Sequence, residues 1–204
     1  MKIQPAVVVL AAGAGSRYLG PRHKLAEGLD GSTVLARTVR NALDSQLPVV
    51  VVLSPVLRAD IAGMLPEADI VILDTTAPLA RGMGVSIAAG VAASSGAGGW
   101  LMLPGDMPLV RPQSLRAVAA ALDQQPVAFA QYHGRRGHPV GFAAELFSEL
   151  VKLRGDDGAR RLLARYPTAA VELDDPGVLM DIDTAEDLAA MRRRFAEAPG
   201  VDSA

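Results

Sequence analysis

The chain contains no cysteine among its 204 residues. This absence excludes disulfide bonds, zinc sites built from thiolates and cysteine nucleophiles. It is typical of proteins that work in a reducing compartment, so the sequence favours a cytoplasmic location. Half of the residues are apolar, which is enough to fill the core of one ordinary α/β domain.

The chain also lacks an excess of either charge, since its formal net charge is −2 and its pI is near 5.9. Domains that bind nucleic acid normally carry a basic face, so we expect no nucleic-acid partner. The apolar run Ala6–Leu10 is too short for a secretory signal or a membrane span, and we expect no membrane partner. Any anionic ligand must therefore be held by local groups.

Short β-branched runs alternate with amphipathic stretches through most of the chain. This pattern predicts an α/β fold in three layers, with a mostly parallel sheet between helices. The expected strands are Ala6–Leu10, Val49–Leu53, Ile70–Leu73, Trp100–Leu103 and Val127–Gln131. The expected helices between them are Ser32–Leu43, Pro55–Leu65, Val85–Ala93 and Arg111–Asp123.

Beyond Gln131 the regular alternation of short β-branched runs and amphipathic stretches changes. We expect this part of the chain to form an elaboration that folds over one edge of the sheet. The elements expected there are a turn at Gly134–Pro139, a strand at Val140–Phe142, helices at Ala144–Leu153 and Asp157–Arg165, a strand-like run at Val178–Asp183 and a helix at Thr184–Ala198. No linker or repeat divides the chain. The sequence therefore predicts a single domain over residues 1–198 and a frayed tail at 199–204.

The first expected strand ends in a glycine-rich loop, Leu10-Ala-Ala-Gly-Ala-Gly-Ser-Arg17. Small residues let backbone amides approach an anion without obstruction by Cβ atoms. Arg17 and Lys24 would supply side-chain cations, and Lys24 stands out because lysine is rare in this chain. On this pattern alone, a tight strand-to-helix turn with two exposed basic residues is an equally good interpretation.

Two better-known phosphate-binding loops can be compared with this segment. A P-loop requires lysine and then serine or threonine after its second glycine, but Pro21 and Arg22 follow Gly20 here. A dinucleotide-binding loop requires an acidic residue at the end of the second strand, but that strand ends in Leu53-Ser54-Pro55. The sequence therefore contradicts a P-loop and disfavours an oxidoreductase.

Further motifs follow the loop along the chain. They are Gly82-Met-Gly-Val-Ser86, Leu103-Pro-Gly-Asp-Met-Pro108, Gly134-Arg-Arg-Gly-His-Pro-Val140, Gly155-Asp-Asp-Gly-Ala-Arg160 and Asp181-Ile-Asp-Thr-Ala-Glu-Asp-Leu188. With the loop and Lys24, this series resembles the molybdenum-cofactor cytidylyltransferase family of MobA-like NTP transferases over nearly the whole chain. The resemblance implies a Rossmann-like, nucleotide-diphospho-sugar transferase-like fold. The chain departs from the family in an insertion of one or two residues between Arg17 and Lys24, and in Ala185, where proline is usual.

Aspartates follow two of the expected strands, where a metal ion would need them. Mg²⁺ takes hard oxygen ligands, commonly one or two carboxylates with phosphate oxygens and water. We expect Asp106 to be a catalytic metal ligand, and strand alternation would point Asp181 and Asp183 to one side. The resemblance favours Asp183 as the second ligand, with Asp181 next, although Asp183 could instead belong to an acidic helix start. Asp156 and Asp157 are better explained as helix caps, with a role near the acceptor as the alternative.

The resemblance also implies which residues bind the nucleotide. They are Leu10, Ala11, Ala12, Gly13, Gly15, Gly82 and Ser86. A small pocket wall with a hydroxyl and backbone groups can distinguish a pyrimidine from a purine. Related guanylyltransferases typically carry glycine at the position of Ala12, so alanine points to CTP. Arg17 and Lys24 would stabilise the triphosphate as catalytic residues.

The basic turn at Gly134–Pro139 is a candidate acceptor site. Arg135 and Arg136 would suit a phosphorylated acceptor such as molybdopterin, although a solvated hairpin would look the same. His138 could orient or deprotonate the acceptor, and a structural histidine before proline is an equal alternative. The acceptor phosphate is itself a competent nucleophile at neutral pH, so we assign no catalytic nucleophile.

These observations predict a Mg²⁺-dependent transfer of CMP from CTP to a phosphorylated cofactor such as molybdopterin, with release of pyrophosphate. The alternatives are another nucleotide or acceptor, such as GTP or a sugar or isoprenoid phosphate, a nucleotide-binding oxidoreductase, and a regulatory module that binds nucleotide without turnover. An enzyme or chaperone that receives the finished cofactor would be a further partner.

Overall fold

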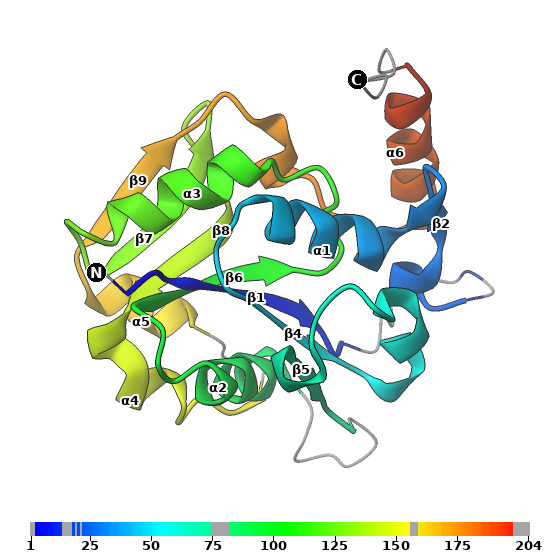
Figure 1. Cartoon of the computed structure of the whole chain (residues 1–204). Helices are drawn as coiled ribbons and strands as arrows, with labels where there is room; N and C mark the ends of the chain where they lie inside the picture. The colour runs from blue at the N-terminus through cyan, green and yellow to red at the C-terminus, as the bar shows by residue number, and fades with distance from the viewer. Residues whose placement is uncertain are drawn as a thin grey trace.

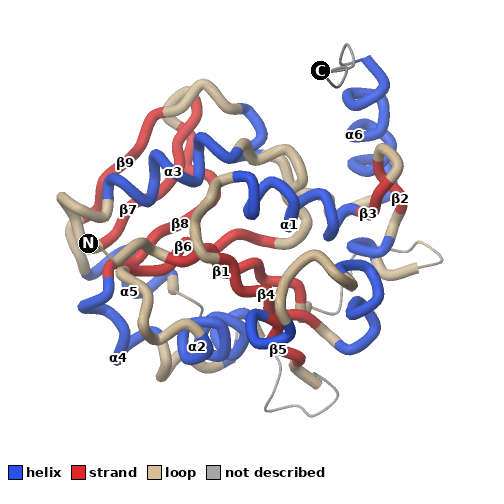
Figure 2. Tube along the Cα trace, viewed as in Figure 1, coloured by secondary structure: helices blue, strands red, loops and turns tan. Residues whose placement is uncertain are grey.

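The computed structural model describes residues 3–13, 18, 20, 22–74, 82–155 and 159–197. A seven-stranded sheet crosses this part of the molecule in the order β5-β4-β1-β6-β8-β7-β9, with helices on both faces (Figures 1 and 2). The strands are β1 (Ala6–Ala11), β4 (Val49–Leu53), β5 (Ile70–Ile72), β6 (Gly99–Pro104), β7 (Val127–Tyr132), β8 (Arg135–Ala143) and β9 (Thr168–Glu172). Of these seven, β8 alone is antiparallel to its neighbours. The expected three-layer, mostly parallel α/β fold is therefore confirmed.

Two helical layers enclose the sheet (Figure 1). One face carries α1 (Val34–Asp44) and α3 (Pro112–Ala121), and α6 (Ala185–Glu197) adds Leu188 and Met191 to the same core. The other face carries α2 (Met83–Ala93), α4 (Phe147–Leu150) and α5 (Arg160–Arg165). The described residues also form short 3-10 helices: η1 (Lys24–Ala26), η2 (Pro55–Ile61), η3 (Glu67–Asp69), η5 (Ala144–Leu146) and η7 (Pro176–Leu179).

The central strands owe their burial on both faces to unbroken apolar sequence. Val7 and Val9 of β1 enter the core under α1 and α3, while Val8 enters the core over α2. This alternation is what a strand covered on both sides requires. None of the described helices is both long and apolar enough to cross a membrane.

The largest departure from the predicted elements lies in β8. Instead of a turn over Gly134–Pro139 and an elaboration over the sheet edge, β8 is inserted between β6 and β7. The turn is confined to His133 and Gly134, whose φ angles of 48° and 73° suit a tight hairpin. Pro139 is tolerated because the β7–β8 register shifts nearby and the pairing with β6 has ended.

Three further differences have local causes. The segment from Pro55 forms a 3-10 helix rather than the predicted α-helix, and it ends at Ile61. The strand-like run predicted at Val178–Asp183 is η7 followed by irregular chain, because Asp175 caps a turn that begins at Pro176. β2 (Gly28–Leu29), β3 (Ser32–Thr33) and β9 were not predicted. The expected tail at 199–204 lies outside the described residues.

Candidate active site

The loops that follow β1 and β6 meet at the carboxyl edge of the parallel strands. The Gly105 amide donates to the Leu10 carbonyl at 2.9 Å, and a Cβ added to Gly105 would lie 3.2 Å from that oxygen. The Asp106 carbonyl accepts a hydrogen bond from the Ile182 amide at 3.1 Å. Open α/β sheets bind their ligands at this edge. The fold thus brings the glycine-rich loop, Asp106 and the chain before α6 to one place.

Two polar residues on the inner side of α1 fasten the loop that carries Asp106. The fully buried Thr38 hydroxyl donates to the Gly105 carbonyl at 2.9 Å. The Asn41 amide donates to the carbonyls of Pro108 and Val110 at 2.9 and 3.1 Å. Sequence reasoning missed both residues, although polar side chains on the buried face of an amphipathic helix were a readable signal.

Lys24 lies at the centre of this edge. Its Nζ donates to Asp106 Oδ2 at 2.5 Å, to Asp183 Oδ1 at 3.2 Å and to the Ile182 carbonyl at 3.0 Å. Burial opposes the charged form, but the carboxylates of Asp106 and Asp183 outweigh burial and raise the pKa of Lys24 above its ordinary value. The ammonium therefore stays charged and joins two segments that are far apart in the sequence.

The donor set of this cluster suits a divalent cation. Asp106 Oδ1 is buried and has no hydrogen-bond partner in the described part of the chain, and such an atom is costly unless a ligand satisfies it. Asp183 adds a half-buried carboxylate beside it. Within the described residues, no three acidic or histidine side chains gather to form a metal site alone. Two carboxylates completed by triphosphate oxygens and water are the pattern that Mg²⁺ prefers.

Two aspartates near the start of α6 have different contacts. Asp187 caps the helix, and Asp183 pairs with Lys24. The Asp187 carboxylate accepts from the Thr184 amide and hydroxyl, both at 2.8 Å, and the Thr184 hydroxyl accepts from the Asp187 amide at 3.1 Å. These bonds, the hydroxyl bond first, lower the pKa of Asp187 and cap the helix. The Asp183 carboxylate is turned to Lys24 instead. Asp181 is exposed, and because this segment is not a strand, alternation does not place it beside Asp183.

The glycine-rich loop is described in part. Leu10 and Ala11 end β1, Ala12 is buried and Gly13 is exposed. Leu10 and Ala12 pack on the α2 side of the sheet, whereas Ala11 joins the core on the α1 side. The predicted site residues Gly15 and Arg17 lie outside the described residues, as do Asp156 and Asp157.

The predicted base-binding segment forms the amino end of α2. Ser86 is buried in its first turn, and Gly82 precedes the helix with a φ of 105°. A Cβ on Gly82 would lie 2.3 Å from the Gly155 carbonyl carbon, and one on Gly84 would lie 2.9 Å from two backbone oxygens. The two glycines therefore let the Arg154–Gly155 backbone pack directly against the start of α2.

Gly82→Ala should destabilise the protein, because alanine is strained at this φ and its Cβ would collide with backbone that cannot rotate away. We expect the melting temperature to fall by about 5 °C or more in thermal unfolding followed by circular dichroism. Gly28→Ala is the matched control, since a Cβ there meets nothing within 4 Å. Equal melting temperatures for the two variants would contradict this packing.

The predicted acceptor residues lie on β8. Arg135 and Arg136 are exposed on opposite faces of the strand, and His138 shares the face of Arg136. The Arg136 guanidinium lies 5.6 Å from the ring centre of Phe129, which packs on the same core as Ala12. Arg136 and His138 are thus on the face of the sheet that carries the base-binding segment, and Arg135 is not.

His138 is set into this face. Burial lowers its pKa and the Arg136 charge adds to this, while contact with the Met102 backbone and the charges of Asp106 and Asp181 oppose the shift. Its Nδ1 atom is buried without a hydrogen-bond partner in the described structure. The imidazole is therefore neutral near pH 7 and presents an unsatisfied acceptor or donor.

The lowered pKa of His138 has a consequence for acid stability. The unfolded chain takes up this proton first, so the free energy of unfolding should decrease as the pH falls below 6.5, the ordinary histidine value. His138→Gln should flatten this decrease in urea titrations between pH 7 and 5. Parallel pH profiles for wild type and His138→Gln would rule out a buried neutral histidine.

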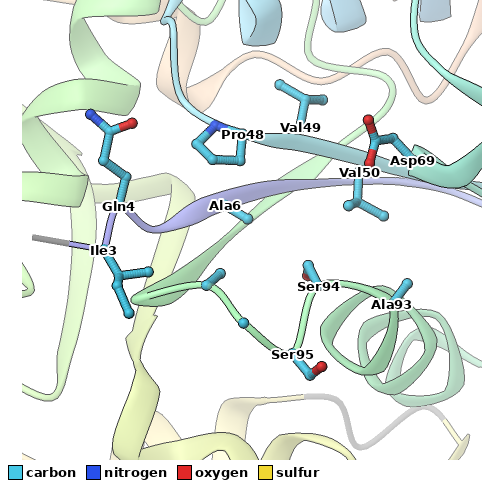
Figure 3. Close-up of a pocket in the computed structure, with 12 residues that line it drawn as sticks. Ile3, Gln4, Ala6, Pro48, Val49, Val50, Asp69, Ala93, Ser94 and Ser95 are labelled. Atoms are coloured by element: carbon cyan, nitrogen blue, oxygen red, sulfur yellow. The ribbon is translucent and has the colours of Figure 1, made fainter. Parts of the chain in front are cut away.

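A separate hollow of about 720 Å³ lies at the opposite end of the strands (Figure 3). It is lined by the chain before β1, the start of β4 and the turn after α2, including Gln4, Pro48 and Ser95 (Figure 3). It contains none of the predicted site residues. The carboxyl edge remains the candidate active site because the charged groups converge there.

Comparisons with known proteins identify the family of the chain. The sequence profile described as "MobA-like NTP transferase domain" matches residues 7–171. The purine catabolism protein PucB of Bacillus subtilis is 33% identical over 93% of this chain and 96% of its own length. A nucleotidyl transferase from Methanothermobacter thermautotrophicus superposes with a TM-score of 0.80 at 26% identity, covering 96% of this chain and 99% of that one. Rv0371c of Mycobacterium tuberculosis, in a structure described as a complex with manganese, gives 0.75 at 27% identity over 93% and 98% of the two chains.

Proposed function

This chain belongs to the MobA-like NTP transferase family, and from that premise we propose that it transfers CMP from CTP to a phosphorylated cofactor such as molybdopterin, releasing pyrophosphate. The observation that carries the proposal is the contact of Lys24 with Asp106 and Asp183 beside the loop after β1. One cation and two carboxylates in contact at this edge supply groups that could bind a triphosphate and its metal ion, and this supports the proposal.

Each residue of the proposed site would have a different role in nucleotidyl transfer. Asp106 and Asp183 would hold Mg²⁺, which supplies charge neutralisation for the triphosphate when it is bound. Lys24 and Arg17 would bind the triphosphate oxygens and stabilise the charge that gathers on the departing pyrophosphate. The backbone of the glycine-rich loop would orient the α-phosphate for in-line attack.

The chemical step needs no protein nucleophile. A phosphate oxygen of the acceptor attacks the α-phosphorus of CTP, a new P–O bond forms, and the bond to pyrophosphate breaks. The acceptor phosphate is already ionised at neutral pH, so no base has to remove a proton. His138 would instead hydrogen-bond the acceptor through its buried Nδ1, with Arg136 binding a phosphate group.

The proposed preference for CTP is supported by the residue at position 12. Ala12 is buried against the core that contains α2, whose first turn carries the buried Ser86. A methyl group at position 12 narrows the space beside the base, which favours a pyrimidine over a purine. GTP is the competing nucleotide, and Ala12→Gly should shift the preference toward it.

A nucleotide panel tests the proposed function. We expect CTP with Mg²⁺ to raise the melting temperature more than GTP, ATP or NADPH, and pyrophosphate to appear when molybdopterin is added. Stabilisation without pyrophosphate release for any phosphorylated acceptor would point to a regulatory module. Stabilisation by NADPH alone would support an oxidoreductase, against the family assignment.

The two hairpin arginines provide a matched pair for the acceptor site. Arg136→Ala should raise the KM for the acceptor about tenfold or more, because it removes a charged hydrogen-bond donor from the face that carries His138. Arg135→Ala, one residue away on the opposite face, should change the KM less than about twofold. Steady-state kinetics at saturating CTP would measure both, and equal effects would argue against an acceptor site on this face.

A further inference from the structure

The side chain that ties Lys24 to the glycine-rich loop belongs to its neighbour, His23. His23 Nε2 lies 2.9 Å from the Gly13 carbonyl oxygen, and His23 Nδ1 accepts a hydrogen bond from the Leu25 amide at 3.2 Å. Because Nδ1 acts as an acceptor, the ring hydrogen resides on Nε2, which donates to Gly13. One imidazole thus joins the end of the described loop to the helix that begins at Lys24.

The rest of η1 is fixed by the core and by the site. Leu25 is buried at 3% exposure, the Ala26 amide donates to the His23 carbonyl at 2.8 Å, and Lys24 reaches the carboxylates. The loop is fixed at its other end by β1. The His23–Gly13 bond joins the loop after β1 directly to η1. It therefore links these two elements through a side chain as well as through the backbone.

We propose that His23 is a positioning residue of the nucleotide site. Its bond to Gly13 sets the separation between the phosphate-binding backbone and the Lys24 ammonium, so that both groups engage the same triphosphate. His23 itself touches no substrate. This inference rests on the proposed nucleotide binding, and it assigns a function to a residue outside the motifs that mark the family.

Two substitutions separate the contacts of the ring. Glutamine places its amide nitrogen near the position of Nε2, so His23→Gln keeps a donor for Gly13 and loses the cap on Leu25. Asparagine places its oxygen near the position of Nδ1, so His23→Asn keeps the cap and loses the bond to Gly13. His23→Ala loses both.

The dissociation constants of CTP and of inorganic tripolyphosphate, each with Mg²⁺, should be measured by calorimetry. We expect His23→Asn and His23→Ala to bind both probes about threefold to tenfold more weakly than wild type, and His23→Gln to stay within about twofold. A purely structural cap predicts the reverse, with His23→Asn rescued and His23→Gln weakened. That reverse order, or wild-type affinity in all three variants, would overturn the proposal.

Hydrogen exchange of the ligand-free protein keeps this inference separate from the proposed function. If wild type binds neither probe, the proposed function fails. The His23–Gly13 bond is then tested by the rate of hydrogen exchange in the peptide covering residues 22–29. Faster exchange there in His23→Asn, which keeps the cap on Leu25, by about threefold or more, supports a mechanical connection between the two elements. Exchange equal to that of wild type overturns it.

Discussion

Asp106→Asn should abolish nucleotidyl transfer while leaving the fold intact, with kcat/KM falling about 10³-fold. Asparagine removes one of the two carboxylates that would hold the metal ion, and it leaves the charge of the triphosphate less well neutralised. The fold should survive because Lys24 keeps its contacts with Asp183 and the Ile182 carbonyl. Neutralising a carboxylate whose Oδ1 is buried without a partner also relieves a desolvation cost.

Pyrophosphate release and circular dichroism would measure the two halves of this prediction. Asp44→Asn, an exposed change at the end of α1, is the control and should retain full activity. Asp183→Asn should lose about as much activity as Asp106→Asn, whereas Asp181→Asn decides whether its exposed carboxylate contributes at all. An Asp106→Asn enzyme with more than a tenth of wild-type kcat/KM would remove Asp106 from the metal site.

The parallel half of the fold could be predicted from sequence because its strands are short apolar runs buried on both faces. β4 has the bounds that were predicted, β1 is one residue longer at its carboxyl end, and β6 is one residue longer at each end. β9 was missed because Thr168-Ala-Ala-Val-Glu172 carries few β-branched residues, and its pairing with β7 is a tertiary effect. β8 was misjudged because glycine, two arginines and proline suggest a turn, whereas its antiparallel partners impose an extended chain.

The site could be predicted as far as motifs mark it. Lys24 and Asp106 were singled out from their residue type and position, Asp183 was favoured by the family resemblance, and the fold brings the three into contact. Their direct pairing could not be foreseen, because they are 82 and 159 residues apart and no local pattern encodes that distance. Thr38, Asn41 and His23 act through backbone carbonyls, and a sequence does not show which carbonyl a side chain will meet.

Lys24→Met should have opposite effects on transfer and on metal binding. Methionine keeps most of the side-chain volume but removes the cation, so kcat/KM should fall about 10²-fold to 10³-fold with the loss of triphosphate stabilisation. In the nucleotide-free protein, however, the Lys24 ammonium lies between the two carboxylates that a metal ion would use. Its removal takes the ammonium away from between Asp106 and Asp183, which favours a divalent cation in its place.

Titration of the nucleotide-free protein with Mn²⁺, followed by electron paramagnetic resonance, would test this competition. Lys24→Met should bind Mn²⁺ at least about tenfold more tightly than wild type, since like charges a few ångströms apart repel strongly near a protein surface. Lys152→Met, which changes an exposed lysine, should bind Mn²⁺ as wild type does. If Lys24→Met gained no affinity, Lys24 and the metal ion would not share these carboxylates. A gain would mean that the triphosphate must draw Lys24 away before the metal ion is fully bound, so that nucleotide and metal enter the site together.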